Sequence, residues 1–364
     1  MQNTVVRRNT LFETEIRSIV SDTSLSCIVV DSGIASGTNN SVELARTDGN
    51  WGSGSNRRFL VASITKPLVA MAVLKLAAQG EMSLSERVGS FLPEFCKGAY
   101  RRITVRHLLT HTSGLPDMLP DNAELRASQA SLPDFQKAAA AVKLDFGTGT
   151  DCRYSSVGYL LLGAIIDRCS SVSCADYLDR EFFQPMKMSE TWLGVPEARR
   201  DELLPGIERC QLPFWQQDAE TWDWNSSYWR TLGAPWGGLI STAADLARYA
   251  RMILSEGATE SGRQILPAKV VAAAQQDQLA SLADEPGFTG SPRPWGFGWR
   301  RQWPAHHASF GDFVSAETFG HWGATGTLMW IDPVNEKYAV VLTATPYEQS
   351  QPHIQRISNV IASA

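Results

Sequence analysis

Ser63 and Lys66 lie three residues apart in the stretch VASITKPLVAMAVLKL, residues 61–76. A serine hydroxyl is a poor nucleophile near neutral pH, and it needs a base within hydrogen-bonding distance. A lysine can serve as that base where its neutral amine is favoured, and burial disfavours the charged ammonium. Residues three apart share one face of a helix, so this spacing brings the two side chains together. The pair therefore has the chemistry of an activated nucleophile.

The residues that follow the pair predict a buried helix, because residues 68–78 are apolar on nearly every face. Pro67 is tolerated in the first turn of a helix but not in its interior, which places the helix start between Ser63 and Thr65. On these residues alone a simpler interpretation stays open. Ser63 would cap the helix, and Lys66 would extend its ammonium to the surface along its own stem.

A second stretch, DCRYSSVGYLLLGAIID at residues 151–167, offers a proton carrier. Ser155 is a good N-cap for the helix that follows, so the phenol of Tyr154 is expected near the positive end of that helix, where a phenolate is favoured. The spacing fits an alternative equally well, in which Tyr154 packs on Tyr159 as a hydrophobic staple.

A third stretch, FGHWGATGTLMWIDP at residues 319–333, leads into a predicted strand and contains three glycines. Glycines in a strand allow close approach of another backbone or a ligand. We expect His321 to project from this strand edge toward a substrate. A backbone N–H nearby would join the N–H of Ser63 as an oxyanion hole.

Taken together, the three stretches resemble the penicillin-recognising serine hydrolases: class C β-lactamases, D-alanyl-D-alanine carboxypeptidases, D-aminopeptidases and lactamase-like esterases. That family carries S-x-x-K, then Y-x-N, then K-T-G or H-x-G. The chain has, in the same order, SITK (63–66), YSS (154–156) and HWG (321–323). The stretches ITVRHLLTHTSGLPD and GGLISTAADLARYARMIL are also similar to the family, and the resemblance covers roughly residues 55–345.

The resemblance implies roles for individual residues. Ser63 would be the nucleophile, Lys66 its partner in proton removal, and Tyr154 the acid and base that protonates the leaving group and later activates water. The backbone N–H groups of Ser63 and Ala324 would form the oxyanion hole, and neither a cofactor nor a metal is implied. The residues expected to contact the substrate are Ser156, His321, Trp322 and Gly323.

The chain departs from the family pattern in two places. Ser156 stands where the family usually has Asn, and His321 with Trp322 replaces Lys with Thr. A fixed cation and a hydroxyl that could hold a substrate carboxylate are therefore expected to be absent. We accordingly expect hydrolysis of carboxylic esters or small amides. The alternatives are a D-amino-acid peptidase or D,D-carboxypeptidase, a weak β-lactamase, and a non-hydrolytic binding or scaffold protein that retains the fold.

Strand patterns occur at both ends of the chain. LSCIVVDSG and SVELAR lie near the start, and TGTLMWIDP with KYAVVLTAT near the end predicts an antiparallel hairpin, followed by a helix after Pro352. The region between is mainly helical. We expect an α+β fold (an α/β sandwich) of the β-lactamase/transpeptidase type. Residues 1–80 and 285–364 would form a helix-flanked antiparallel sheet, residues 81–284 an inserted helical domain, and the site would lie at their interface.

The composition limits the possible partners of this 364-residue chain. A net charge of −5 and a pI near 5.8 argue against nucleic acid and anionic membranes, because no basic excess exists to meet phosphates. No apolar run reaches the ~18 residues that cross a bilayer. Six scattered cysteines without a C-x-x-C pair indicate neither a disulfide scaffold nor a zinc site. With no secretory signal at the start, we expect a cytoplasmic protein, or a periplasmic one if a leader was removed.

Two further patterns have alternative interpretations. His107 and His111 have the i,i+4 spacing of metal ligands, but no H-E-x-x-H surrounds them and no third ligand is evident. The segment at 214–238 holds five tryptophans, Trp215, Trp222, Trp224, Trp229 and Trp236. Such rings usually belong to the core, and the alternative is that part of the segment contacts an apolar acyl group.

Overall fold

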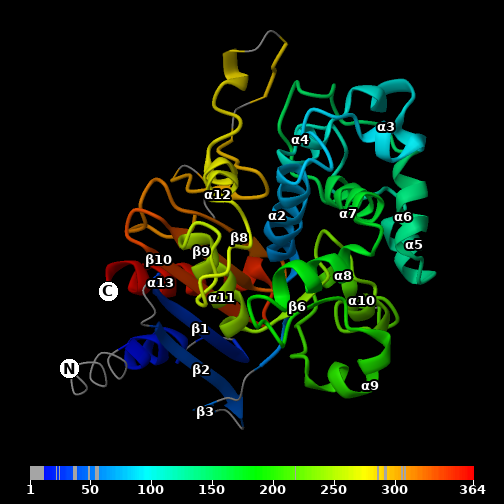
Figure 1. The fold of residues 1–364 in the computed structure, drawn as a ribbon. Helices are drawn as coiled ribbons and strands as arrows, with labels where there is room; N and C mark the ends of the chain where they lie inside the picture. The colour runs from blue at the N-terminus through cyan, green and yellow to red at the C-terminus, as the bar shows by residue number, and fades with distance from the viewer. Residues whose placement is uncertain are drawn as a thin grey trace.

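The sheet is assembled from both ends of the chain. The computed structural model describes residues 12–364 except 22, 24, 36–38, 48–49, 54–56, 218, 285–286, 291–292, 305 and 307–308. Seven antiparallel strands lie in the order β3-β2-β1-β10-β9-β8-β7 (Figure 1). They are β1 (Cys27–Ile34), β2 (Asn39–Thr47), β3 (Asn50–Ser53), β7 (Arg300–Arg301), β8 (Phe319–Gly323), β9 (Thr327–Asp332) and β10 (Lys337–Thr343). The predicted fold class is confirmed, since β1 pairs directly with β10.

The register of the central strands places apolar residues on both faces of the sheet. β9 and β10 form the predicted antiparallel hairpin, with Asp332 opposite Lys337. In β1, Ile28 and Val30 face one hydrophobic cluster, and Val29 faces the other. Side chains alternate between the faces of a strand, so near-continuous burial of β1 requires helices on both sides.

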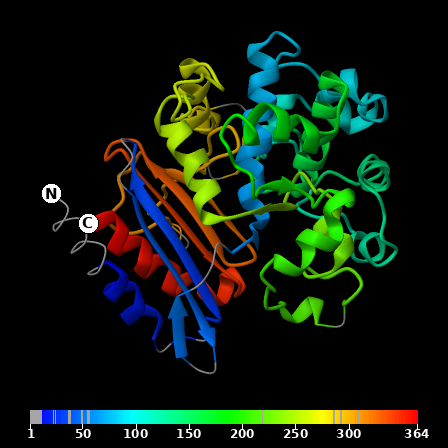
Figure 2. The same ribbon diagram turned by 60° about the horizontal axis from the view of Figure 1, so that its bottom comes forward.

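Helices supply that cover. A helix at residues 12–20 and α13 (Tyr347–Ser363) lie on one face, and α11 (Ala243–Leu254) lies on the other (Figure 2). The remaining helices are α2 (Thr65–Ala78), α3 (Val88–Phe91), α4 (Val105–Leu109), α5 (Asn122–Ala127), α6 (Leu132–Ala139), α7 (Ser156–Ser170), α8 (Cys174–Leu178), α9 (Arg200–Leu203), α10 (Ser227–Thr231) and α12 (Ala268–Gln275). A second sheet joins β4 (Phe59–Leu60), β6 (Leu239–Ser241) and β5 (Trp192–Leu193).

The last helix begins earlier than predicted. α13 starts at Tyr347, so Pro352 lies inside the helix and not before it. A proline interrupts one backbone hydrogen bond, and the carbonyl left without a donor belongs to the exposed Glu348, where water can replace it. The stripe that includes Ile354 and Ile357 is fully buried against the sheet, which favours helix over the whole span.

Helix α2 is the buried centre of the molecule. It begins at Thr65, inside the predicted window, and all but three of its fourteen residues are buried. It packs against α7 and α12, and its partly buried Lys75 forms an ion pair with Glu181 at 2.7 Å. The domain boundaries stay a prediction. Helix α11 packs on β1 and β10, although its residues were assigned to the helical domain.

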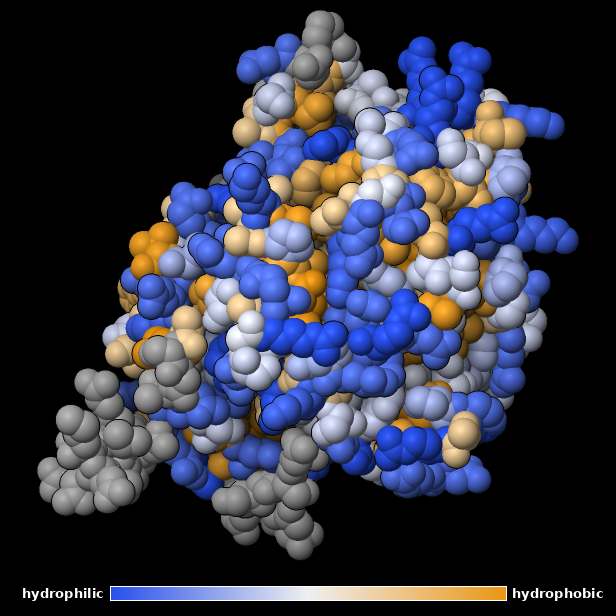
Figure 3. All heavy atoms as spheres, viewed as in Figure 1, coloured by the Kyte–Doolittle hydropathy of each residue, from blue (hydrophilic) through white to orange (hydrophobic). Residues whose placement is uncertain are grey.

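The surface in the view of Figure 1 is mostly hydrophilic, with apolar side chains in scattered patches (Figure 3). Within the described residues, no single helix has the length and apolar composition to span a bilayer, and only α7 with residues 174–183, bent by 75°, meets that test as a pair. Residues 1–11, on which the expectation of a missing signal rests, lie outside the described residues. The cellular location stays a prediction.

Replacing Ser358 with alanine should destabilise the fold without altering the site. The buried Ser358 hydroxyl accepts a hydrogen bond from Trp330 Nε1 at 2.7 Å and donates to the carbonyl of Phe310. Removing it leaves a buried donor and acceptor unpaired, so we expect a loss of about 1–3 kcal/mol in the free energy of unfolding. Urea denaturation measures it. The exposed Ser363→Ala on the same helix is the control, and an equal loss there would contradict the argument.

Candidate active site

Ser63 and Lys66 meet at the start of the buried helix. Ser63 lies in a short 3₁₀ turn, Ala62–Ile64, that leads directly into α2. Lys66 Nζ is 3.1 Å from Ser63 Oγ and donates a second hydrogen bond to the carbonyl of Trp236 at 2.7 Å. The simpler interpretation of the pair is wrong on both counts. Ile64 occupies the N-cap position of α2 without a side-chain bond, and Lys66 is completely buried.

Burial decides the charge of Lys66. Removal from water lowers the pKa of its ammonium to about 7, and the carboxylate of Asp117 acts weakly in the opposite direction. The ring of Tyr154 lies 4.7 Å from Nζ and supplies a partly compensating cation–π contact. At neutral pH a large fraction of Lys66 is therefore the free amine, which can accept the proton of Ser63.

Tyr154 lies beside the pair, but its phenol is not ionised. Ser155 is the N-cap of α7, as predicted, and its side chain accepts from the Gly158 N–H. Burial and the charge of Asp117 nevertheless raise the pKa of Tyr154 well above its usual value, and the effects of Ser63 and Arg300 in the other direction are smaller. The expectation of a favoured phenolate is therefore wrong. The group enters any reaction as a proton donor.

The ring of Tyr154 contacts histidines and not the predicted staple partner. His111 lies 4.8 Å and His321 5.8 Å from it, measured between ring centroids. Its hydroxyl is buried, and Ser63 is the side-chain partner that acts on it among the described residues. The phenol keeps further bonding capacity for a substrate or water.

His321 is a buried, neutral ring on β8. Its Nδ1 lies 2.7 Å from the carbonyl of Trp322, which only a protonated Nδ1 can bond, so Nε2 is the unprotonated nitrogen. Burial, Lys66 and Arg300 hold the pKa of His321 well below its usual range. Its buried Nε2 has no partner among the described side chains and can accept a hydrogen bond.

The turn after β8 and the first residue of β9 are tied against the turn that carries Ser63. Thr325 Oγ1 donates to the carbonyl of Leu60 at 2.6 Å, and Thr327 Oγ1 donates to that of Val61 at 3.0 Å. A Cβ atom on Gly323 would lie 2.3 Å from the carbonyl oxygen of Val61, so only glycine allows this approach. The turn after β8, which begins at the exposed Ala324, is thereby held beside Ser63.

Two N–H groups at this junction suit an oxyanion. Ser63 is the second residue of its 3₁₀ turn, where the first amides have no acceptor within the turn. Ala62, just before it, has a left-handed φ of 46°, an uncommon conformation for a residue with a Cβ. The predicted pairing of the Ser63 and Ala324 N–H groups fits this arrangement, and it stays a prediction.

Ser156 is bound to an aspartate that the sequence analysis did not single out. Its Oγ donates to Asp117 Oδ1 at 2.7 Å, and its backbone N–H donates to the same oxygen at 3.0 Å. The proton of Ser156 is thus committed to Asp117. A role of Ser156 in substrate binding stays a prediction, in which it could act only as an acceptor or as part of a wall.

Trp322 lies on the opposite side of β8 from His321, because neighbouring strand residues face opposite ways. Its ring stacks on Tyr347 at 5.6 Å, and the Arg300 guanidinium lies 3.6 Å from its centroid. Arg300 also lies 4.8 Å from the ring of Trp295. A cation therefore stands beside the strand after all, supplied by β7. The expectation that no cation holds a substrate carboxylate stays a prediction, as does substrate contact by Trp322.

His107 and His111 do not share one helix, although their spacing allowed it. His107 bonds to Thr104 in a capping box at the start of α4, and His111 lies beyond the end of that helix. Among the described residues, no group of three or more His, Cys, Asp or Glu side chains is placed to bind a metal ion.

The tryptophan-rich segment divides between core and surface. Trp224, Trp229 and Trp236 are buried, whereas Trp215 is 58% exposed. Trp236 also lines a cavity of about 10 Å³ together with Leu160. The core interpretation is confirmed for the three buried rings, and contact of the segment with an apolar acyl group stays a prediction.

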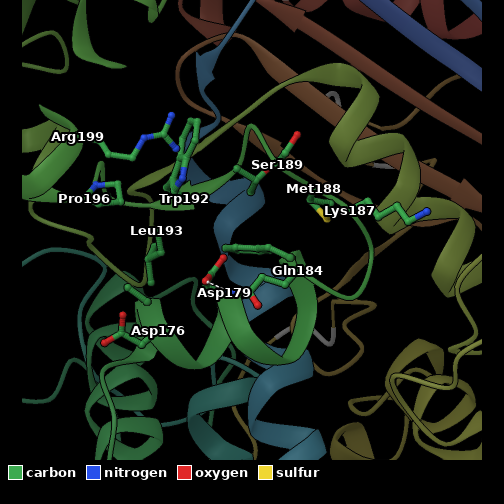
Figure 4. A pocket seen from close by; sticks show the side chains of 14 residues that line it. Asp176, Asp179, Gln184, Lys187, Met188, Ser189, Trp192, Leu193, Pro196 and Arg199 are labelled. Atoms are coloured by element: carbon green, nitrogen blue, oxygen red, sulfur yellow. Dashed lines mark hydrogen bonds between the residues drawn. The ribbon is translucent and has the colours of Figure 1, made fainter. Parts of the chain in front are cut away.

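A much larger hollow lies elsewhere. A volume of about 500 Å³ is lined by residues that include Asp176, Asp179, Lys187, Trp192 and Arg199 (Figure 4). None of its lining residues was predicted to act in the site. Size alone does not mark the reactive centre here.

Sequence reasoning missed residues that reach the site from distant segments. Asp117 ends the matched stretch ITVRHLLTHTSGLPD, so its position carried a signal that was not used. Arg300 and Trp295 follow no motif, and only the pairing of β7 with β8 brings them close. Thr325 and Thr327 stood within the HWG stretch, but their bonds to residues 60 and 61 depend on the fold.

Comparison with known proteins gives consistent matches. The model of the family described as Beta-lactamase matches residues 36–360. The chain is 30% identical over 272 residues to penicillin-binding protein 4 of Amycolatopsis lactamdurans, covering 74% of this chain and 66% of that one, just under two thirds of its length. It is 30% identical over 321 residues to esterase EstB of Burkholderia gladioli, covering 80% of this chain and 78% of the esterase.

The fold has a counterpart among solved structures. EstCE1, described as a hydrolase with promiscuous acyltransferase activity, superposes with a TM-score of 0.76 at 17% identity, covering 98% of this chain and 99% of that one. At that identity the likeness supports the fold alone.

The state of Lys66 predicts how the reactivity of Ser63 depends on pH. Because the amine must be neutral to accept a proton, covalent labelling of Ser63 by a fluorophosphonate should accelerate as pH rises through about 7 and level off above it. Labelling rates followed by intact mass between pH 5.5 and 9 measure this. Lys66→Ala should label slowly and without the rise. A rate that is flat, or that falls with pH, would show that Lys66 is not the base.

Proposed function

This chain belongs to the beta-lactamase family, and on that basis we propose that it is a serine hydrolase that cleaves short carboxylic esters or small amides through an acyl-enzyme on Ser63. The esterase and penicillin-binding relatives support the hydrolase class. The observation that carries the proposal is the completely buried Lys66 amine, 3.1 Å from the Ser63 hydroxyl and with a pKa of about 7.

In the proposed acylation, the net result is that the proton of Ser63 passes to the leaving group and the acyl carbon exchanges its bond to the leaving group for a bond to Ser63 Oγ. Lys66 takes the proton of Ser63 as Oγ attacks the substrate carbonyl, and the N–H groups of Ser63 and Ala324 stabilise the oxyanion. The carbonyl re-forms as the bond to the leaving group breaks. Tyr154 donates its phenolic proton to the departing alkoxide or amine and recovers one from the Lys66 ammonium. The products are an ester on Ser63 and a neutral alcohol or amine.

The proposed deacylation repeats these transfers with water. Water replaces the leaving group beside Tyr154, and its proton passes through the phenol toward Lys66 as its oxygen attacks the Ser63 ester. Ser63 departs and regains its proton, which releases the carboxylic acid. The neutral phenol of Tyr154 suits a carrier that passes protons in both directions.

The space around Trp236 is small. Side chains that include Phe135, Leu160 and Trp236 line a cavity of about 10 Å³, which has room for about one water and none for a long acyl chain. The carbonyl of Trp236 bonds to Lys66, so this wall lies directly behind the amine. We therefore propose acetyl-sized acyl groups as the preferred ones.

Replacing Ser63 should abolish hydrolysis. Wild type should cleave p-nitrophenyl acetate and gain a transient acetyl adduct in intact mass spectra, whereas Ser63→Ala should do neither, with a rate at least about a hundredfold lower. Brief exposure to a penicillin gives a second adduct, and the two adduct lifetimes rank esterase against β-lactamase.

Each other outcome has a distinct meaning. Equal turnover in both proteins would show that the nucleophile is wrong. A wild type with neither turnover nor adduct would favour the non-hydrolytic binding protein.

Arg300 favours a second candidate function, in which the substrate carries a carboxylate, as in D-amino-acid peptides. Burial lowers the pKa of its guanidinium only to about 10, so it is charged at neutral pH. It forms no ion pair with a carboxylate of the described residues, although Arg301 beside it pairs with Glu317. Its cation–π contacts with Trp295 and Trp322 compensate only part of the cost of burying the charge, and a substrate carboxylate would offset more of it.

Replacing Arg300 separates the two functions. Arg300→Met should raise KM for 3-carboxyphenyl acetate by about 10- to 100-fold, since a hydrogen-bonded charge contributes about 1.5–3 kcal/mol. KM for the neutral phenyl acetate should stay within about twofold. Steady-state kinetics on the two esters measure the difference. Equal effects on both esters would exclude a carboxylate subsite at Arg300.

A further inference from the structure

We propose that His111 is a positioning residue that holds Tyr154 in place for proton transfer. The inference rests on the proposed function, because it concerns a step of that reaction. Among the described residues, no further side chains are placed to complete a metal site with His111. Its contacts instead surround a single residue of the site.

The backbone on both sides of Tyr154 is fastened to His111. The N–H of Arg153 donates to the carbonyl of His111 at 3.0 Å, and the N–H of Ser155 donates to its ring Nδ1 at 3.1 Å. Two bonds to one residue fix the chain just before and just after Tyr154. The side chain between them can then vary little more than its own rotamer.

The ring of His111 also packs on the phenol. Its centroid lies 4.8 Å from that of Tyr154 and 4.5 Å from that of Trp295, which closes the space around the phenol from two sides. This contact matters because the side-chain partner that acts on the Tyr154 hydroxyl is Ser63, which itself reacts. Packing and backbone must therefore hold that oxygen in place while Ser63 reacts.

The hydrogen bond from Ser155 requires a neutral ring. Nδ1 accepts, so the proton of His111 is on Nε2, and a second proton would remove the acceptor. The charged groups that face the ring, Lys66 and Arg300, are both cationic when protonated, and with burial they hold the pKa of His111 well below its usual range. The remaining neighbours, Tyr154, Tyr159 and His321, are neutral, so the acceptor persists at working pH.

The conformation of His111 suggests a faithful substitute. Its φ is 59°, in the left-handed region that asparagine tolerates better than most residues. The side-chain oxygen of asparagine also occupies about the place of Nδ1 and can accept from Ser155. His111→Asn should therefore preserve the clamp on the backbone, whereas His111→Gln, whose oxygen is one bond further out, should not.

Two esters that share an acetyl group but differ in leaving group test the proposal. Phenolate is more basic than p-nitrophenolate, so its departure depends more on a proton from Tyr154. For His111→Gln, kcat/KM should fall at least about 30-fold on phenyl acetate and at most about threefold on p-nitrophenyl acetate. His111→Asn should keep both values within about threefold of wild type. His107→Gln, in the same segment but with its ring bonded to Thr104 and not to the residues that flank Tyr154, should leave both unchanged.

The outcomes separate the clamp from the function beneath it. An equal loss of kcat/KM on the two esters, or the same leaving-group dependence in His111→Asn, would overturn the clamp and leave the hydrolase intact. Turnover by wild type that survives Ser63→Ala, or no turnover at all, would overturn the proposed function and the clamp with it. Should His111→Gln fail to fold, His111→Asn decides alone: activity on phenyl acetate retained with an acceptor at that position supports the clamp, and its selective loss refutes it.

Discussion

The burial of Lys66 is the constraint on which the rest of the site depends. A pKa lowered from 10.5 to about 7 corresponds to roughly 5 kcal/mol of disfavour for the ammonium. Such a shift needs a helix that is buried almost all round, and α2 meets that need through its packing against α7, α8 and α12. The apolar run that first predicted a core helix and the basicity that the chemistry requires therefore have one physical origin.

The second requirement is a fixed distance between two segments that are far apart in sequence, the turn that carries Ser63 and strand β8. Ser63 comes from the turn before α2, and the strand that faces it, β8, lies about 260 residues further along the chain. Thr325 and Thr327 bond to the carbonyls of Leu60 and Val61, and Gly323 leaves room for that contact. The strained φ of Ala62 is tolerated because these contacts hold the turn from both sides.

Short-range sequence patterns correctly predicted the elements that depend only on residues close together in the chain. The start of α2, the Ser155 cap and the β9–β10 hairpin follow from residues close in sequence. The protonated state of Tyr154 could not be predicted from nearby residues. Burial by distant segments raises the pKa of its phenol and outweighs the helix N-terminus, which favours the phenolate. Arg300 was not predicted for the same reason. Trp295 reaches it through the loop before β7, and Trp322 reaches it through the pairing of β7 with β8.

The pairing of β1 with β10 has a consequence for how the protein is made. Ile34 lies opposite Lys337, so a central strand of the sheet waits during translation for a partner synthesised about 300 residues later. Closing so long a loop is slow, and until then one edge of β1 is open to other chains. The half of the site that carries Ser63 leaves the ribosome early, and the half from β8 leaves near the end. If the proposed site is right, hydrolytic competence arrives only with the last strands, and a nascent or stalled chain lacks it.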